Sequence, residues 1–306
     1  MIWNHQSTMK YLKTSGQDKL KLPYKLRSNQ QKIIDTIKKG LDSKNHVVIE
    51  APTGSGKTFT SLASALPFVL DNNHKIIYCV RTNSQQEQVI KELKEFKKSG
   101  NKVSVVAIQG RQSMCPQQKD DNELAKSNWS EKSKICKSLK LQSKMGEAGC
   151  PYYRKLVRPA KNLIANWSSE IYSAEEFTAN AEKEGLCPYE LNKLLLKEAQ
   201  VVIVPYVYFF EEFIRKYLLE WMETSIDKIV TIVDEAHNLP DWSRDAASDS
   251  LSVDSLRRAS QESNKFGLLL GDGSPPTLFL DLIESALRSL GEFHIAENDD
   301  EGLLPS

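Results

Sequence analysis

The sequence predicts an α/β fold in which the strands of a parallel sheet alternate with helices. Short runs rich in valine and isoleucine alternate with segments whose apolar residues recur at helical spacing. A glycine-bearing loop stands between one such run and a helical segment, and a later run ends in two acidic residues. Together these observations favour a parallel sheet with right-handed crossovers.

The expected elements follow this alternation in order. We expect strands at residues 47–50, 75–80, 102–108, 201–204 and 229–233. We expect helices at residues 27–39, 59–63, 84–98, 188–197 and 206–223, with Gly40 ending the first. The alternation stops over residues 113–187, which we interpret as an insertion into one α/β domain. Beyond residue 248, a polar helical segment with a Gly/Pro break at 271–276 leads to an acidic tail at 297–301.

Length and composition set broad limits. The 306 residues suffice for one large domain or about two ordinary ones, and the formal net charge is +1. A basic surface for nucleic acid must therefore be local. The sequence holds no run of eighteen apolar residues, and its first residues form no apolar secretory core. These features predict an intracellular protein that does not span a membrane.

Residues 51–58, Ala-Pro-Thr-Gly-Ser-Gly-Lys-Thr, have the pattern of a phosphate-binding P-loop. Glycines let the backbone wrap a phosphate, and the following helix directs free N–H groups toward it. The residues expected at the nucleotide are Gly54, Ser55, Gly56, Lys57 and Thr58. Lys57 is expected to reach the outer phosphates and Thr58 to hold Mg²⁺. The alternative is an ordinary glycine turn before a helix.

Residues 234–237, Asp-Glu-Ala-His, end the last apolar run and predict the other half of a nucleotide site. Asp234 is expected to hold Mg²⁺, and Glu235 to orient and deprotonate the attacking water. His237 is expected to sense the γ-phosphate. Gln30, upstream of the loop, either reads adenine or caps a helix.

Four cysteines, Cys115, Cys136, Cys150 and Cys187, lie in the insertion, whereas Cys79 lies on an expected strand and is interpreted as core. Four thiolates suit either tetrahedral zinc or a [4Fe–4S] cluster. No CxxC pair occurs, so the spacing alone does not choose between these metals or exclude four unligated thiols.

The P-loop, the Asp-Glu-Ala-His sequence and Val80-Arg81-Thr82 after the second strand together resemble a superfamily 2 helicase. The interposed cysteines narrow the resemblance to the XPD/DinG-like iron–sulfur helicases, with the archaeal XPD branch closest. The segments at 110–115, 149–153 and 187–189 resemble the cluster-binding segments of that family. The resemblance runs from about Tyr24 to Trp242. It implies a [4Fe–4S] cluster and an ATP-dependent 5′→3′ DNA helicase in DNA repair.

The resemblance also implies a domain organisation. Residues 1–112 and 188–245 would form a RecA-like motor domain, interrupted by the Fe–S insertion at 113–187. Residues 246–306 resemble the start of the helical Arch segment. No second RecA-like domain follows, so we expect a second chain, if any, to complete the ATP cleft. We expect a cytoplasmic protein in a prokaryote, archaeal by resemblance, or a nuclear one in a eukaryote.

A local excess of basic residues points to a nucleic-acid face in the insertion. These residues are Lys132, Lys134, Lys137, Lys140, Lys144, Arg154, Lys155, Arg158 and Lys161. Basic side chains beside aromatic ones suit phosphate contact with base stacking, although a solvated charged face is the alternative. By resemblance, the DNA path would include Arg81, Thr82, Asn83, Arg111, Tyr189 and Lys193. Tyr206 either lies near the DNA or belongs to the core.

The leading hypothesis is therefore an incomplete helicase motor that binds ATP, Mg²⁺, a [4Fe–4S] cluster and single-stranded DNA or a single/double-strand junction. We expect it to unwind DNA poorly alone. The alternative is a non-motor ATP- and DNA-binding module, or a fragment that needs a second chain. A nuclease-bearing DinG-like helicase ranks lower, because few residues precede Tyr24.

Overall fold

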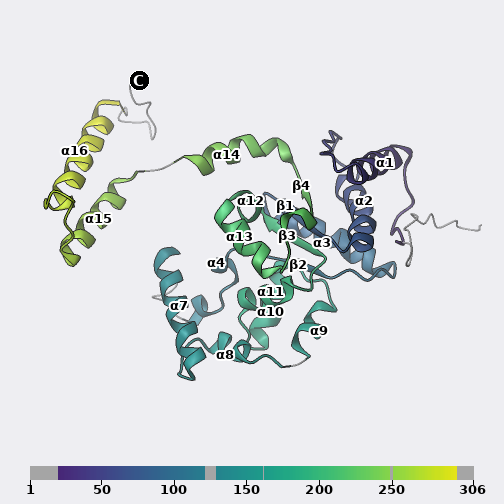
Figure 1. The fold of residues 1–306 in the computed structure, drawn as a ribbon, viewed down its shortest axis with the longest axis horizontal. Helices are drawn as coiled ribbons and strands as arrows, with labels where there is room; N and C mark the ends of the chain where they lie inside the picture. Colours follow the sequence, from purple (N-terminus) through teal and green to yellow (C-terminus); the bar gives the residue numbers. More distant parts are fainter. Residues whose placement is uncertain (1–19, 121–128, 161, 249–250, 295–306) are drawn as a thin grey trace, which may run out of the picture. The chain divides into compact units, whose positions relative to one another are not determined.

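The computed structural model describes residues 20–120, 129–160, 162–248 and 251–294 (Figure 1). The chain divides into two compact units, residues 1–236 and 237–306. Two features of the sequence, Lys161 and the acidic tail at 297–301, lie outside the described residues.

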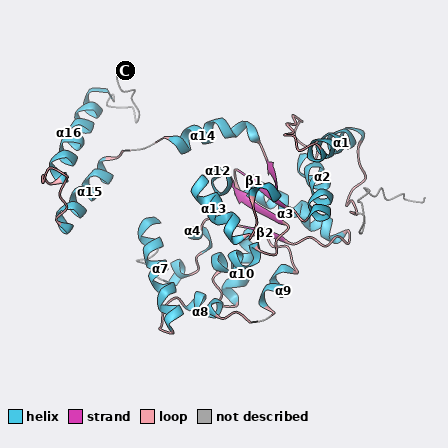
Figure 2. Ribbon diagram, viewed as in Figure 1, coloured by secondary structure: helices cyan, strands magenta, loops and turns pink. Residues whose placement is uncertain are grey.

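A four-stranded parallel sheet forms the centre of the first unit (Figure 2). Its strands are β1 (Lys75–Val80), β2 (Val105–Ala107), β3 (Val201–Pro205) and β4 (Ile229–Val233), in the order β2-β3-β1-β4. Every pairing is parallel, which confirms the predicted sheet. β-Branched residues dominate these strands and suit a buried pleated surface.

Successive strand residues point to opposite faces of the sheet, so both faces carry apolar side chains that helices can cover. Helices α1 (Ser28–Asp42), α2 (Lys57–Asn72) and α3 (Asn83–Lys98) follow the predicted pattern. One face of β1, with Ile76 and Tyr78, joins the main core with α2 and α3. On the opposite face Ile77 and Cys79 are also fully buried, which confirms that Cys79 is a core residue.

The segment that carries the four cysteines is helical in the described residues. It contains α4 (Arg111–Met114), α5 (Gln117–Asp120), α7 (Trp129–Met145), α8 (Pro151–Val157), α9 (Leu163–Ser168) and α10 (Ala174–Lys183). Helix α11 (Pro188–Leu196) then returns the chain to the sheet, as predicted. Three aromatic rings, Trp167, Tyr172 and Phe177, contact one another and form a small core in this segment.

The expected strand at residues 47–50 is wrong. Within the described residues this run has no strand partner, and the Val48 side chain is 94% exposed. A strand exists only through hydrogen bonds to a neighbour, and β4 pairs with β1 alone in the described part of the chain. The apolar run thus leads into the P-loop without regular secondary structure.

Three other expected boundaries shift. Gly40 lies inside α1 and does not end it. A Cβ at this position would approach Val47 Cγ2 to 2.1 Å, so the glycine allows close packing against Val47. Strand β2 covers only residues 105–107, in the second half of the expected run at 102–108. The single helix expected at 206–223 is two helices, α12 (Tyr206–Phe210) and α13 (Glu212–Trp221). The helical conformation is interrupted at Glu211, whose ψ of 114° is that of an extended residue.

The second unit is helical, with α14 (Leu239–Ala247), α15 (Val253–Phe266) and α16 (Pro276–His294). Helices α15 and α16 pack together, and Arg257 Nε donates to Glu284 Oε1 at 3.0 Å between them. The predicted Gly/Pro break separates these two helices. Among the helices that are described, none has the length and apolar character needed to cross a membrane.

Candidate functional site

The P-loop joins the segment at residues 47–50 to the N-terminus of α2. Gly54 and Gly56 have φ of +74° and +84°, a backbone region that side chains with a Cβ rarely adopt. Gly56 is the N-cap residue of α2, and Lys57 begins the helix. The loop therefore directs the first amides of a sixteen-residue helix toward the site where the sequence predicts phosphates.

Lys57 links the loop to the acidic turn. Its Nζ donates to the Ala51 carbonyl oxygen at 3.0 Å and lies 3.7 Å from Glu235 Oε1. The two side chains are about a third exposed (31% and 32%), so the site is open to a ligand. Residues almost 180 positions apart thus meet at the carboxyl ends of the parallel strands, the edge where such sheets bind ligands.

The two carboxylates sit on a tight turn after β4. Glu235 has φ of +49°, an uncommon conformation for a residue with a side chain. Its backbone N–H donates to Asp234 Oδ1 at 3.1 Å, while the Asp234 N–H donates to the Cys79 carbonyl at 3.0 Å. Burial and the charge of Glu235 raise the pKa of Asp234, against a smaller opposing effect of Lys57. A divalent cation would relieve the repulsion between these carboxylates.

Tyr206 also contacts this turn through hydrogen bonds. Its hydroxyl donates to the backbone carbonyl of Asp234 and also to that of Glu235, at 3.2 Å. The side chain is only 2% exposed, so Tyr206 is a core residue whose polar tip contacts the acidic turn. Its link to the turn was missed from the sequence, because no local pattern joins a residue after β3 to one after β4.

Gln30 contacts the P-loop backbone. Its Nε2 donates to the Ser55 carbonyl at 3.0 Å, and its Oε1 accepts from the Arg27 N–H at 3.1 Å at the N-terminus of α1. Gln30 therefore caps the first turn of α1, and its contact with adenine stays a prediction. His237 belongs to the second unit, where its Nε2 lies 3.2 Å from Asn238 Nδ2.

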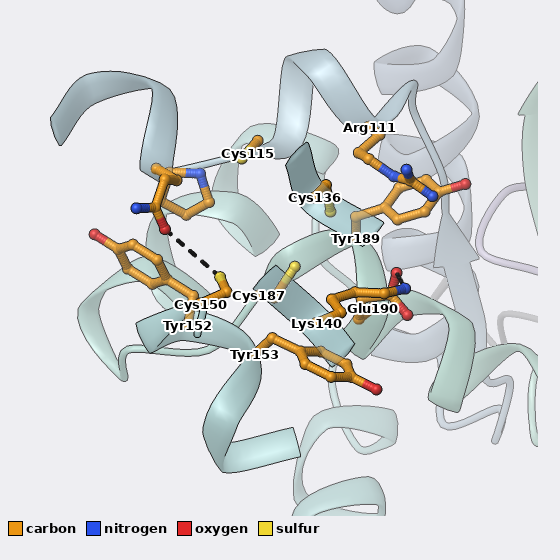
Figure 3. Close-up of a pocket in the computed structure, with 12 residues that line it drawn as sticks. Arg111, Cys115, Cys136, Lys140, Cys150, Tyr152, Tyr153, Cys187, Tyr189 and Glu190 are labelled. Atoms are coloured by element: carbon orange, nitrogen blue, oxygen red, sulfur yellow. Dashed lines mark hydrogen bonds and ion pairs between the residues drawn. The ribbon is translucent and has the colours of Figure 1, made fainter. Parts of the chain in front are cut away.

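The four cysteines of the insertion line one pocket (Figure 3). Cys115 precedes α5 and Cys136 lies on α7, while Cys150 and Cys187 are the N-cap residues of α8 and α11. Tyr152 and Tyr153 also line the pocket. In the parts of the chain that are described, no three His, Cys, Asp or Glu side chains form a group that could hold a metal ion. The structure therefore brings the four thiols to one place without showing a metal centre.

The thiol environment affects what this pocket can bind. Burial raises the pKa of Cys187 to about 12, and burial also raises the pKa values of Cys115 and Cys136. These thiols are therefore protonated at neutral pH when they have no metal, and a bound metal would displace their protons. Cys150 Sγ lies 3.6 Å from Gln117 Oε1, the contact drawn in Figure 3.

A charged cluster borders the pocket. Glu190 Oε1 lies 2.6 Å from Lys140 Nζ and 3.6 Å from Lys193 Nζ. Burial alone would raise the pKa of Glu190, but the neighbouring cations outweigh it and hold this pKa below its usual range. The Arg111 guanidinium and the Lys193 ammonium each lie 5.0 Å from the centre of the Tyr189 ring. Three residues expected on the DNA path thus lie together, and two of them, Arg111 and Tyr189, line this pocket.

Comparison with known proteins decides the family. The profile of the DEAD_2 family matches residues 78–256, more than half of the chain. The chain belongs to the DEAD_2 family. This DEAD_2 chain is 26% identical over 247 residues to the XPD helicase subunit of the general transcription and DNA repair factor IIH from Arabidopsis thaliana. That match covers 75% of this chain and 31% of the relative.

Other relatives are consistent with this family. The Fanconi anemia group J protein homolog of Gallus gallus is 30% identical over 191 residues, which cover 61% of this chain and 14% of that protein. A solved structure described as XPD_Helicase matches with a TM-score of 0.56 and 22% identity, over 92% of this chain and 44% of that chain. The DEAD_2 chain thus spans about a third or less of these curated relatives. The matches confirm its resemblance to the N-terminal part of an XPD-like superfamily 2 helicase.

The remaining expected DNA contacts of the DEAD_2 chain lie elsewhere. Arg81, Thr82 and Asn83 are exposed at the carboxyl end of β1. The Thr82 hydroxyl accepts from the Gln85 N–H at 3.3 Å and so caps α3. The cap is a local structural role for Thr82, and the DNA contact of all three residues stays a prediction.

Proposed function

We propose that this DEAD_2 chain is the ATP-hydrolysing motor part of an XPD-like DNA helicase or translocase. One observation carries the proposal: Lys57 of the P-loop lies 3.7 Å from Glu235 of the acidic turn. An ordinary glycine turn before a helix would have no reason to meet two carboxylates at the ligand-binding edge of a parallel sheet. The helicase relatives support the same reading at the level of the family.

In this proposal each side chain has one role. Lys57 and the amides of Gly54, Ser55 and Gly56 bind the phosphates. Thr58 and Asp234 hold Mg²⁺, which neutralises charge on the phosphates. Glu235 orients the attacking water and accepts its proton. His237 responds to the γ-phosphate, and Gln30 contacts adenine while it supports the P-loop.

The proposal includes a [4Fe–4S] cluster at the four-cysteine pocket. The donor set supports it, because four thiols from separate elements line a single pocket. A single zinc ion would draw four sulfurs to about 2.3 Å from one point, whereas a cluster is bound by thiolates spread around its own volume. When bound, the cluster would cross-link segments that are distant in sequence. A zinc ion is the alternative outcome.

Polarity, pathway and location also belong to the proposal. By family resemblance the motor moves 5′→3′ on single-stranded DNA and works in DNA repair, and the residues 246–306 begin an Arch-like segment. DNA repair appears in the name of the Arabidopsis relative. The relatives named above are eukaryotic and lend no support to an archaeal origin. A nuclear location follows if this chain is eukaryotic, and a cytoplasmic one if it is prokaryotic.

Single-turnover ATP hydrolysis, with and without single-stranded DNA, tests the motor. We expect DNA-stimulated hydrolysis that is lost in Lys57→Ala and Glu235→Gln, with ATP binding retained in the second variant. Lys91→Ala, at an exposed position of α3, is the matched control and should hydrolyse normally. ATP binding without hydrolysis in the wild type would favour the non-motor module, unless a second chain restores turnover.

Metal analysis of anaerobically purified protein tests the pocket. We expect a brown protein with about four irons per chain, and loss of iron when Cys187 is replaced by serine. Cys79→Ser, in the core of the sheet, is the matched cysteine control and should keep its iron. A colourless protein with one zinc would overturn the cluster and leave the ATPase proposal intact.

A further inference from the structure

Helix α13 carries aromatic residues that its packing does not use. Leu218 on α13 and Met222 at its C-cap are fully buried and attach this segment to the domain. Phe213 and Tyr217, by contrast, are 66% and 42% exposed. Together with Trp221 they recur every fourth residue, which places them along one side of the helix. A single exposed aromatic residue is ordinary, but three at this spacing form a continuous surface.

The rings contact one another in a row. Phe213 and Tyr217 have centroids 5.1 Å apart, and Tyr217 stacks on Trp221 at 6.3 Å with 24° between the planes. Trp221 then meets Tyr189 of α11 at 6.3 Å, edge to face. We call these four residues the aromatic track. Its outer end is exposed, and its inner end, Tyr189, is one of the residues that line the four-cysteine pocket.

Cations accompany the inner half of the aromatic track. Lys193 Nζ lies 4.1 Å from the Trp221 ring centre and 5.0 Å from that of Tyr189, and Arg111 lies over Tyr189. The Arg111 Nε is buried and has no hydrogen-bond partner among the residues described. This end of the track therefore combines ring faces with positive charge and an unused donor.

We propose that the aromatic track is a stacking surface for single-stranded nucleic acid, with bases on Phe213 and Tyr217 and the backbone directed toward Lys193 and Arg111. Stacking on rings beside cations is how proteins bind single strands without sequence preference. From Phe213 to Trp221 the helix rises about 12 Å, which matches about three or four nucleotides at 3.4 Å each. Duplex DNA does not fit, because its bases are already stacked and paired.

The inference rests on the proposed nucleic-acid motor and extends its strand path onto α13. Positive charge next to the rings favours a polyanion over an apolar protein segment.

Binding of a fluorescent oligothymidylate to the full chain, measured by anisotropy, tests the track. Phe213→Ala and Tyr217→Ala should each weaken binding about 5-fold or more, whereas Tyr217→Phe should retain affinity because it keeps the ring. Phe266→Ala, which removes a similarly exposed ring (67%) from α15, is the matched control. The salt dependence of binding should not change in the ring variants, since no phosphate contact is lost.

An abasic strand of the same length separates stacking from a structural effect. The wild type should prefer the base-bearing strand, and the Phe213→Ala/Tyr217→Ala double variant should lose that preference. Equal affinity and equal base preference in the wild type and the double variant would overturn the track while leaving the motor proposal in place. A wild-type chain that binds no single-stranded DNA would overturn the DNA part of the proposed function, and the track with it.

Discussion

Replacing Tyr206 by phenylalanine removes one hydroxyl and leaves a buried ring in place. That hydroxyl donates to the backbone carbonyls of Asp234 and Glu235. Losing one net hydrogen bond costs about 0.5–1.5 kcal/mol, and leaving a partly buried carbonyl without a donor raises the cost toward about 2 kcal/mol. We therefore expect the free energy of unfolding to fall by about 1–2 kcal/mol.

The same substitution should slow ATP hydrolysis. Glu235 is held at φ of +49°, a conformation that costs about 1–3 kcal/mol and persists only where surrounding contacts impose it. Without the hydroxyl the turn can relax and move the Glu235 carboxylate. A displacement of about 1 Å costs up to about 100-fold in rate, and partial relaxation should cost about 10-fold. ATP affinity should change little, because Lys57 and the P-loop are untouched.

Single-turnover hydrolysis and ATP binding, measured on the same preparations, check this prediction. Tyr208→Phe is the matched control, because Tyr208 is also a buried residue of α12 and its hydroxyl donates to the Gln109 carbonyl at 3.2 Å. It should lose similar stability and keep normal hydrolysis. If Tyr206→Phe loses stability but hydrolyses ATP at the wild-type rate, Tyr206 does not position the carboxylates and the reasoning is refuted.

Three further outcomes follow from other contacts. Lys75 Nζ donates to the carbonyls of Leu196, Lys197 and Met222 at 3.2, 2.5 and 2.9 Å. Lys75→Met should therefore lower the free energy of unfolding, measured by urea titration, by about 2–3 kcal/mol. The control Lys91→Met should leave the free energy of unfolding nearly unchanged. A hydrogen bond from Lys94, with others at Ser173, holds the pKa of Glu176 below its usual range. The ionised Glu176 therefore stabilises the fold above the ordinary carboxyl pKa, and this stabilisation is lost as the pH falls through the folded-state pKa. Glu176→Gln should lower the free energy of unfolding by less than about 1 kcal/mol at neutral pH and leave it unchanged in acid. Chelation of metal from anaerobic protein should increase proteolysis between Cys115 and Cys187 without weakening ATP binding. Equal proteolysis before and after chelation would count against a structural metal in this segment.

The nucleotide loop could be predicted from the sequence because its physics is local. Gly54 and Gly56 take positive φ, as the pattern implies, and α2 starts at Lys57. The helical spacing of Val89 and Leu93 likewise marked the buried side of α3. In each case neighbours along the chain determine the conformation, so a short window of sequence contains the information.

Other features depended on residues far apart in the chain. Among the residues described, the apolar run at 47–50 lacks a strand partner, and Gly40 stands where Val47 leaves no room for a Cβ. The hydroxyl of Tyr206 bonds to the acidic turn, 28 residues further along the chain. The rings of α13 form a candidate binding surface only because Trp221 contacts Tyr189 and Lys193. Strand pairing, burial and ring contacts are long-range terms that local pattern does not encode. The sequence alone therefore determined which chemical groups this DEAD_2 chain carries, whereas the tertiary structure decided which of them meet.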